Sequence, residues 1–421
     1  MTNQTTKNDP NHCIDCNIRL NDVLAVSDFT ERDLELLKRP QRVLTFSIPV
    51  RMDSGEVKVF NAYRVQYNNA LGPAKGGIRY HQEVDLEEVK TLSFLMALKT
   101  SLLHVPFGGG KGGIEVNPHE LSTGELERLT RGFVRAAHQF IGPKTDIPAP
   151  DVNTNAQVMA WFVDEYAKLT GNFEPGVVTG KPLELGGSEG REEATALGGA
   201  FVLEHHRKNT LKKETNELTV AIQGFGNVGG HIARILSGWG YKVVAVSDAY
   251  CAVYNKDGLD IDALTQWKSE NNKCEGFAGG EEIKGEDLLT LDVDILIPAA
   301  LANQITKENA QDIKADVVLE MANAPTTKEA DEILNEKNVI VLPDILANAG
   351  GVVVSYFEWA QNASNDYWSK EEVNNRLEKK MLNIAEIVAN KVAESGKTHR
   401  AVSYELAIER ILKAERMRGN I

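Results

Sequence analysis

The amino-acid sequence predicts an α/β protein made of two domains. At 421 residues, the chain is longer than a single hydrophobic core usually supports. From Leu218 onward, short continuous apolar runs alternate with stretches of helix length, which is typical of strands covered on both faces. Strand, helix and strand repeated in this way predict a parallel, doubly wound sheet in the C-terminal half. The apolar runs are Leu218–Gln223, Lys242–Asp248, Val293–Pro298, Val317–Met321 and Val339–Pro343.

The N-terminal half has a different pattern. Residues 1 to about 20 are expected to form a loose tail, followed by a helix from about residue 28 to residue 38. Two runs rich in Val, Phe, Tyr and Ile, Arg42–Val50 and Val57–Tyr67, predict strands. Asp85, with Glu88 three residues later, forms a capping-box pattern that begins a helix reaching about Leu103.

The boundary between the domains is expected near Gly186–Glu189. Glycines at this point would provide a hinge between two lobes, a common arrangement when a site must open and close. We therefore assign residues 1–187 to the first domain and residues 188–398 to the second. After Trp368 the pattern is helical to the end, and we expect the last helix, about residues 399–421, to pack back on the first domain.

Composition and charge exclude several classes of protein. The formal net charge of −14 argues against nucleic acid or an anionic membrane as the main partner. No apolar run is long enough for a transmembrane helix, and the polar N-terminus lacks the apolar stretch of a signal peptide. Four cysteines in this length fit a reducing compartment, so we expect a cytoplasmic protein. Cys13 and Cys16 form a lone C-x-x-C, and because a zinc site would need two further ligands, free thiols in a mobile tail and no metal are expected.

A glycine fingerprint, G-F-G-N-V-G, lies directly between the strand Leu218–Gln223 and an apolar helix. In this context it predicts a dinucleotide site. The first glycine permits a tight turn, the second lets a pyrophosphate approach the backbone, and the third lets helix and strand pack closely. The phosphates would lie at the positive end of the helix. The expected contacts from this segment are Gly224, Gly226, Asn227, Val228 and Gly229.

Asp248 ends the next strand, where an acidic side chain can accept hydrogen bonds from the ribose hydroxyls. A carboxylate would also repel a 2′-phosphate. No Lys or Arg occurs between Ala249 and Asn255 to receive such a phosphate. These observations favour NAD over NADP, and the alternative is that Asp248 only begins a turn.

Two lysines of the N-terminal half have unusual surroundings. Lys75 lies in G-P-A-K-G-G-I-R, which we interpret as a loop whose glycines let a ligand approach the backbone. Lys99 falls inside an apolar stripe on the helix that begins near Leu86. The stripe consists of Leu92, Leu95, Met96, Leu102 and Leu103. A lysine on a buried face needs a partner, such as a carboxylate ligand, unless its amine extends to solvent.

Lys111 is surrounded by glycines in G-G-G-K-G-G. This is not a phosphate-binding P-loop, because no Ser or Thr follows the lysine. Burial and neighbouring lysines would both depress the pKa of its amine, which suits acid–base chemistry. Asp151 ends the stiff segment D-I-P-A-P-D and is, taken alone, equally consistent with a turn residue and a proton carrier.

These segments resemble, in order, the blocks of the glutamate/leucine/phenylalanine/valine dehydrogenases. The matching motifs are G-P-A-K-G-G-I-R, P-F-G-G-G-K-G-G-I, D-I-P-A-P-D-V, G-F-G-N-V-G and N-A-G-G-V-V-V-S-Y-F-E-W. The resemblance covers nearly the whole chain from about Leu20 and is greatest to the NAD-linked glutamate dehydrogenases of bacteria.

The resemblance implies a role for each matching residue. Lys111 would be the catalytic lysine, and Asp151 would pass protons to and from the amino group and water. Lys99 would bind the α-carboxylate of the amino acid, and Lys75 with Ser355 would bind the distal carboxylate. The residues that line the substrate pocket would be Met96, Ala149, Asn348 and Val352. Those on the nicotinamide and ribose side of the cofactor would be Thr195, Asn227, Ala300, Asn323 and Asn348.

The resemblance also implies an N-terminal α/β domain for substrate binding and oligomerisation, a Rossmann-type NAD-binding domain and a homohexamer. The reaction would be the reversible oxidative deamination of L-glutamate to 2-oxoglutarate and ammonium. Leucine- and phenylalanine-type enzymes usually carry an apolar residue in place of Lys75, and a buried lysine would be unpaired against a leucine side chain. Glutamate is therefore the expected substrate. The alternatives are a branched-chain or aromatic amino-acid dehydrogenase, and an inactive regulatory relative that would lack Lys111 or Asp151.

Overall fold

The computed structural model describes residues 13–421, which form two compact units. Of the described residues, unit 1 contains 13–189, 354–373 and 404–421, and unit 2 contains 190–353 and 374–403. Residues 354–373, which the sequence assigned to the second domain, therefore cluster with the first unit. The first twelve residues of the expected tail lie outside the described part.

Unit 1 contains a five-stranded mixed sheet in the order β1-β2-β4-β3-β5. The strands β1 and β2 are antiparallel, as are β2 and β4, whereas β3 is parallel to both β4 and β5. The strands are β1 (Arg42–Arg51), β2 (Val57–Asn68), β3 (Ala74–His81), β4 (Gly108–Glu115) and β5 (Asp146–Pro150). The helices of this unit before residue 190 are α1 (Ile14–Val26), α2 (Glu31–Leu34), α3 (Leu86–Leu102), α4 (Thr123–Ala137) and α5 (Ala156–Thr170). The predicted strands β1 and β2 and the predicted helix α3 are confirmed.

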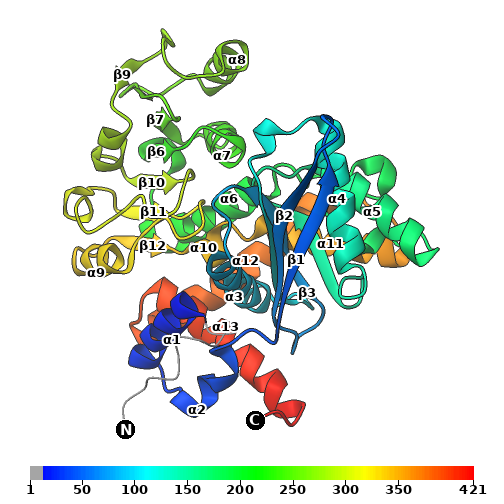
Figure 1. The fold of residues 1–421 in the computed structure, drawn as a ribbon. Coiled ribbons are helices and arrows are strands. Elements are labelled where there is room, and N and C mark those ends of the chain that lie inside the picture. The colour runs from blue at the N-terminus through cyan, green and yellow to red at the C-terminus, as the bar shows by residue number, and fades with distance from the viewer. Residues whose placement is uncertain (1–12) are drawn as a thin grey trace. The chain divides into compact units, whose positions relative to one another are not determined.

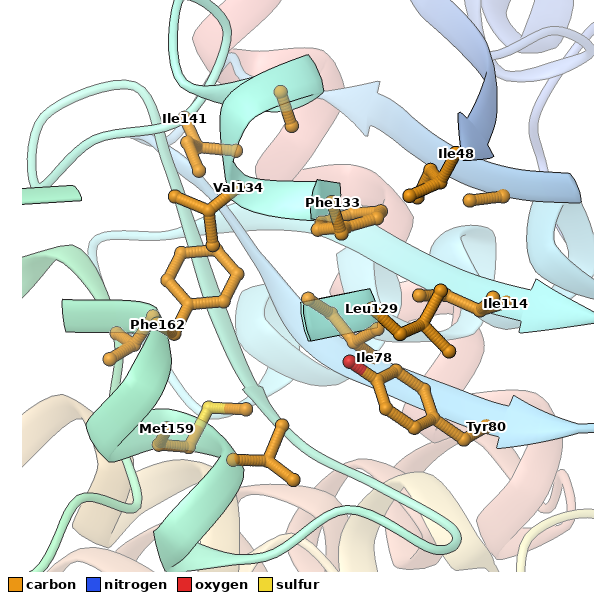
Figure 2. Close-up of a cluster of buried hydrophobic side chains, with 14 of the residues drawn as sticks. Ile48, Ile78, Tyr80, Ile114, Leu129, Phe133, Val134, Ile141, Met159 and Phe162 are labelled. Carbon is orange, nitrogen blue, oxygen red and sulfur yellow. The ribbon is translucent and has the colours of Figure 1, made fainter. Parts of the chain in front are cut away.

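The main core of unit 1 lies between the sheet and the pair of helices α4 and α5 (Figure 1). Leu129 and Phe133 of α4 pack with Phe162 of α5 and with Ile78 and Ile114 of the two central strands, as Figure 2 shows. These buried apolar side chains hold one face of β3 and β4 in place. The opposite face of the same strands is thereby left for α3.

The interpretation of residues 13–20 as a loose tail with free thiols was wrong. These residues belong largely to α1, and Cys13 and Cys16 are joined by a disulfide bond with both sulfur atoms buried. Cys16, Leu20 and Val23 are spaced so that they share one helix face, and this face is buried. Cys13 Sγ lies 3.8 Å from Thr91 Oγ1 of α3. Polar composition concealed this short apolar stripe.

The interpretation of the segment around Lys75 as a loop was also wrong, because this segment forms β3. Glycine is uncommon in strands, so its abundance here masked the extended conformation. A Cβ atom on Gly76 would lie 1.6 Å from the Gly110 carbonyl oxygen of β4. Gly76 therefore permits close packing of β3 on β4 within the protein, and the expected role of these glycines in making room for a ligand does not account for it.

Strand β4 is approached closely on both faces. A Cβ atom on Gly109 would lie 2.4 Å from the Ser93 carbonyl oxygen, so α3 reaches the strand at backbone distance. On the other face, a Cβ atom on Gly110 would lie 3.2 Å from Nη2 of Arg64. Arg64 and Asp146 form an ion pair whose side chains are both 0% exposed. Alternate glycines of β4 thus face a helix on one side and a buried ion pair on the other.

Unit 2 contains a seven-stranded sheet in the order β12-β11-β10-β6-β7-β8-β9. Its strands are β6 (Thr219–Gln223), β7 (Lys242–Ser247), β8 (Ala252–Tyr254), β9 (Glu281–Ile283), β10 (Ile295–Pro298), β11 (Val317–Leu319) and β12 (Ile340–Leu342). The five strands expected from the apolar runs are parallel, which confirms the predicted α/β class and doubly wound sheet. The short strands β8 and β9 extend the sheet in antiparallel pairing and were not predicted.

Helices lie beside the strands of unit 2, as the ribbon in Figure 1 shows. The core of this unit contains Ala221, Leu296 and Val318 from the central strands. The helices within residues 190–349 are α6 (Ala194–His206), α7 (Asn227–Gly238), α8 (Ile261–Asn271), α9 (Lys328–Glu336) and α10 (Asp344–Ala347). The remaining helices are α11 (Gly350–Ser364), α12 (Lys370–Ser395) and α13 (His399–Met417). Across residues 13–421, no helix combines the length and apolarity needed to cross a membrane.

The tight packing of α3 on β4 gives a testable consequence. Gly109→Ala is expected to lower the free energy of unfolding by about 3 kcal/mol, because the added methyl group would force the helix away from the strand. Gly238→Ala in α7 is the matched control, since nothing lies within 4 Å of its Cβ position. Urea denaturation of both variants measures the effect. Unchanged stability of Gly109→Ala would contradict this description of the packing.

Candidate active site

Lys111 and Asp151 are brought together by the sheet of unit 1. Lys111 lies in the middle of β4, and Asp151 directly follows β5. The Lys111 ammonium donates a hydrogen bond to Asp151 Oδ1 and forms an ion pair with it. The lysine side chain is 5% exposed and the aspartate side chain 16% exposed, so the pair is largely shielded from water.

Arg79 of β3 is the second partner of Asp151. Its Nε donates to Asp151 Oδ2 at 2.8 Å, so each carboxylate oxygen has a different cationic partner. The other end of the guanidinium pairs with Glu88 in the first turn of α3. Asp85 caps this helix by accepting the Glu88 N–H at 2.7 Å, whereas the Glu88 carboxylate pairs with Arg79. The sequence pattern indicates Glu88 only as part of a capping box.

The ionisation of this group is shifted by its surroundings. Burial lowers the pKa of the Lys111 amine and the Arg79 charge lowers it further, while Asp151 acts in the opposite direction. Burial alone would raise the pKa of Asp151, but the charges of Lys111 and Arg79 outweigh it and hold that pKa well below its usual range. We expected neighbouring lysines to depress the pKa of Lys111, and the cation that does so is an arginine.

Lys75 and Lys99 are both buried in the same unit. They are 2% and 7% exposed, respectively, and each has an interaction partner within the protein. In the parallel pairing of β3 with β4, Lys75 lies opposite Gly109 and Arg79 lies opposite Gly113. Because side chains alternate along a strand, Lys75 and Arg79 share with Lys111 the face of the sheet that is covered by α3.

Lys99 lies on α3, and its expected burial is confirmed. The single apolar stripe that suggested it is only partly correct. The helix is buried around most of its circumference, including Ser93 and Thr100, whereas Leu92 and Met96 are only half-buried. Other elements cover α3 away from β4, because Thr91 lies beside Cys13 at the start of α1 and the Ser101 hydroxyl donates to the Ala407 carbonyl oxygen of α13 at 2.7 Å.

Three further residues assigned to substrate binding also lie in unit 1. Met96 of α3 has its Cγ 3.4 Å from the Cβ position of Gly76. Ala149 is buried on β5 opposite Gly77 of β3. Ser355 is buried on α11 and is 3% exposed.

The glycine fingerprint of unit 2 has the geometry of a phosphate-binding turn. Gly224 adopts φ +96° between β6 and α7, and a Cβ atom on it would lie 2.9 Å from the Ala300 Cβ. A Cβ atom on Gly229 would lie 1.7 Å from the Gly224 carbonyl oxygen, so helix and turn are in backbone contact. Nothing lies within 4 Å of the Cβ position of Gly226, which is exposed with Asn227 at the start of α7. These features fit a dinucleotide whose pyrophosphate lies against the exposed backbone at the helix N-terminus.

Asp248 follows β7, and its carboxylate forms more interactions within the protein than its position in the sequence suggests. Its carboxylate accepts the Tyr250 N–H at 2.9 Å and the Cys274 N–H at 2.7 Å, and Lys268 Nζ lies 3.3 Å from Oδ2. Burial would raise the pKa of Asp248, but these backbone hydrogen bonds and the Lys268 charge lower it. Lys268 also donates to the Phe225 carbonyl oxygen at 2.8 Å, which places its amine beside the fingerprint.

The remaining residues assigned to the cofactor lie in unit 2. The Asn348 side chain donates to Asn323 Oδ1 at 3.1 Å, so these two are adjacent. Thr195 Oγ1 is 2.5 Å from the Cβ position of Gly351 at the start of α11. Val228, also assigned to the cofactor, is half-buried in the first turn of α7. Val352, which was assigned to the substrate pocket, is half-buried on α11 one residue after Gly351.

Sequence reasoning missed three charged residues: Arg79, Glu88 and Lys268. Arg79 follows Lys75 by four residues, and the alternation of side chains would have placed both on one face if the segment had been recognised as a strand. No comparable signal exists for Lys268, because it reaches Asp248 from a separate helix, α8. Among the described residues, no group of three or more His, Cys, Asp or Glu side chains could hold a metal ion.

Comparison with known proteins identifies the family to which the chain is similar. Residues 186–419 match the Glutamate/Leucine/Phenylalanine/Valine dehydrogenase family, and residues 40–168 match the Glu/Leu/Phe/Val dehydrogenase dimerisation domain. A glutamate dehydrogenase of Thermotoga maritima is 52% identical over 391 residues, which are 92% of this chain and 94% of the relative. An NAD-specific glutamate dehydrogenase of Staphylococcus aureus is 48% identical over 395 residues, 93% of this chain and 94% of the relative.

Solved structures show the same relationship. The glutamate dehydrogenase of Peptoniphilus asaccharolyticus superimposes with a TM-score of 0.86 and 42% identity, covering 98% of this chain and 100% of that chain. The hetero-hexameric glutamate dehydrogenase of Thermus thermophilus in its Leu-bound form gives a TM-score of 0.91 and 37% identity, covering 96% of each chain. The resemblance recognised in the motifs is therefore confirmed, and the chain belongs to the glutamate/leucine/phenylalanine/valine dehydrogenase family.

Proposed function

We propose that the protein catalyses the reversible oxidative deamination of L-glutamate to 2-oxoglutarate and ammonium with NAD, and that it assembles as a homohexamer. The observation that carries the proposed chemistry is the shielded Lys111–Asp151 pair, in a unit that also buries Lys75 and Lys99. The names of the relatives support the choice of glutamate. The homohexamer rests on the family resemblance.

Two buried lysines suit a substrate with a carboxylate at each end. We assign the α-carboxylate of glutamate to Lys99 and the distal carboxylate to Lys75 with Ser355. Pairing with a substrate carboxylate would stabilise an ammonium group that is shielded from water. An apolar amino-acid side chain beside Lys75 would offer its ammonium group no charge-assisted hydrogen bond, so it is expected to bind less favourably than a carboxylate. Met96, Ala149, Asn348 and Val352 are proposed to line the pocket.

Lys111 and Asp151 are proposed to move the protons. Asp151 would accept a proton from the α-ammonium group, so that the nitrogen lone pair assists loss of hydride from Cα. Lys111, as the neutral amine, would take a proton from the water molecule that attacks the resulting iminium carbon. Asp151 would then return its proton to the nitrogen, which leaves as ammonia as the carbonyl forms. The hydroxyl proton and the proton held by Lys111 pass to solvent, where one of them converts ammonia to ammonium, and Lys111 is restored as the neutral amine. Because its pKa is held low, Asp151 would carry the proton only transiently.

The fingerprint of unit 2 is proposed to hold NAD, which when bound supplies the hydride acceptor. Thr195, Ala300, Asn323 and Asn348 are proposed to contact its nicotinamide and ribose side. Asp248 would disfavour a 2′-phosphate by charge repulsion, and Lys268 at 3.3 Å would partly offset that repulsion. Both Asp248 oxygens already accept backbone N–H groups, but a carboxylate has further lone pairs for a ribose hydroxyl.

A steady-state assay of the purified protein tests the proposed function. Glutamate, leucine, valine and phenylalanine are each offered with NAD and with NADP, and reduced cofactor is measured by absorbance. Glutamate with NAD is expected to be the preferred combination. Rapid oxidation of leucine without oxidation of glutamate would refute the proposal.

Lys111→Ala is expected to reduce turnover by roughly 10²- to 10⁴-fold, since the variant loses the group that activates water. Binding of NAD, measured by calorimetry, should be unchanged because the lysine lies in unit 1 and the fingerprint in unit 2. Near-normal turnover in Lys111→Ala would show that another group performs the step.

Lys75→Leu is expected to lower kcat/KM for glutamate by about 100-fold, because the distal carboxylate would lose a charged partner. The same variant is expected to gain activity towards apolar amino acids. Lys144→Leu, which removes a lysine from the loop before β5, is the control. Unchanged glutamate kinetics in Lys75→Leu would exclude the proposed contact.

Asp248→Asn is expected to raise the ratio of kcat/KM for NADP to that for NAD by about tenfold, because it removes the charge that repels a 2′-phosphate. Asp257→Asn, at an exposed position in the turn after β8, is the matched control. If the ratio is the same in wild type, Asp248→Asn and Asp257→Asn, Asp248 does not determine the cofactor.

A further inference from the structure

The proposed reaction uses Lys111 and Asp151 but leaves a second ion pair beside them without a task. Arg79 and Glu88 extend the pair into a row of alternating charges, Lys111–Asp151–Arg79–Glu88. The four side chains come from four different segments: β4, the residue after β5, β3 and α3. The exposed fraction of the side chains rises along the row, from 5% for Lys111 and 16% for Asp151 to 18% for Arg79 and 37% for Glu88. The outer pair thus connects the shielded pair to the protein surface.

Arg79 constrains the orientation of the Asp151 carboxylate. Its Nε donates a hydrogen bond to Oδ2 at 2.8 Å, while Oδ1 accepts the hydrogen bond from Lys111. The backbone of Asp151 is fixed independently, because its N–H donates to Thr154 Oγ1 at 2.7 Å and that hydroxyl donates to the Ile78 carbonyl oxygen at 2.9 Å. Because the backbone is held, the hydrogen bond from Arg79 fixes the orientation of the Asp151 carboxylate towards Lys111. A lysine at position 79 would keep the charge but lack the planar donor set of guanidinium.

Glu88 is well placed to moderate the Arg79 charge. It pairs with the guanidinium at the end remote from Asp151, and its own backbone is held by the Asp85 cap of α3. The charged groups with the largest effect on Lys111 are Asp151, Arg79 and Glu88, and the buried Lys75 shares its face of the sheet. Arg79 lowers the pKa of the Lys111 amine, whereas Glu88 raises it. Removing Arg79 should therefore raise the pKa of the Lys111 amine, whereas removing Glu88 should lower it.

We propose that Arg79 is a positioning residue for Asp151, and that Glu88 tunes the charge which Arg79 presents to Lys111 and Asp151. The proposal rests on the proposed roles of Lys111 and Asp151 in glutamate oxidation. It assigns to the G-G-I-R portion of the motif a function separate from substrate binding. Glu88 reaches this site from the first turn of α3 (Leu86–Leu102).

The test compares full-length wild type with Arg79→Met, Arg79→Lys, Glu88→Gln and the double variant Arg79→Met/Glu88→Gln. The pH dependence of kcat/KM for glutamate with NAD gives the acidic limb, where activity rises as Lys111 loses its proton. Reductive methylation of Lys111 as a function of pH, followed by peptide mass spectrometry, reports the same ionisation without turnover. Circular dichroism establishes that each variant is folded.

Arg79→Met and Glu88→Gln are expected to shift the acidic limb and the labelling midpoint in opposite directions, by roughly 0.5 to 1 pH unit. Glu88→Gln removes a negative charge, so the acidic limb and the labelling midpoint should move to lower pH. Arg79→Met removes a positive charge, so both should move to higher pH, and the double variant should return towards wild type. Arg79→Lys should lower kcat with little movement of the midpoint, because it keeps the charge and loses the hydrogen bond to Oδ2.

Arg128→Met is the matched control, since Arg128 forms an exposed pair with Asp53 in the same unit. It should leave both midpoints unchanged. Shifts of the same sign in Arg79→Met and Glu88→Gln, or lower activity at every pH with fixed midpoints, would overturn the proposal. If Arg79→Met does not fold, Glu88→Gln alone tests the charge coupling: a shift of both midpoints to lower pH supports it, and unchanged midpoints overturn it. Failure of the proposed function would instead appear as no oxidation of glutamate by wild type, and the labelling midpoints would still test the charge coupling.

Discussion

The close approach of α3 to β4 is the constraint on which the structure of the candidate active site depends. Gly109 permits this approach, and Gly110 permits the buried Arg64–Asp146 pair to lie against the opposite face of the strand. A strand with ordinary side chains at these positions would separate the helix from the sheet. Lys111 lies on the same face of β4 as Gly109 and is consequently shielded, with 5% of its side chain exposed. The same packing that excludes water from its amine also lowers the pKa of that amine.

Burial of several charges in one small region is tolerated because they alternate in sign. Each charge in the row Lys111–Asp151–Arg79–Glu88 forms an ion pair with its neighbour of opposite sign. Arg64 and Asp146 form a separate ion pair on the other face of the sheet. Removing a single member would leave a neighbour unpaired in a shielded position, which is more costly than removing both. This arrangement keeps a lysine and an aspartate in ionised contact while leaving their pKa values sensitive to nearby charges.

Much of this could be predicted from the sequence, and the failures have physical reasons. The strands of unit 2 were predictable because they are continuous apolar runs, and the fingerprint beginning at Gly224 because its neighbours are a strand and a helix. Strands β3 and β4 were obscured because packing requirements fill them with glycine, a residue that sequence patterns associate with turns. The role of Arg79 could not be recognised without knowing that its segment is a strand. Contacts such as Lys268 with Asp248 join separate elements, and no local pattern records them.

The central claim is that the Lys111–Asp151 pair acts on the reacting carbon of a substrate whose two carboxylates are bound by Lys99 and Lys75. A crystal structure of the protein with 2-oxoglutarate tests this claim most directly. The account predicts the keto oxygen within hydrogen-bond distance of Lys111 Nζ, with the 1-carboxylate on Lys99 and the 5-carboxylate on Lys75. A ligand that is bound through other residues, with its keto group remote from both Lys111 and Asp151, would contradict it.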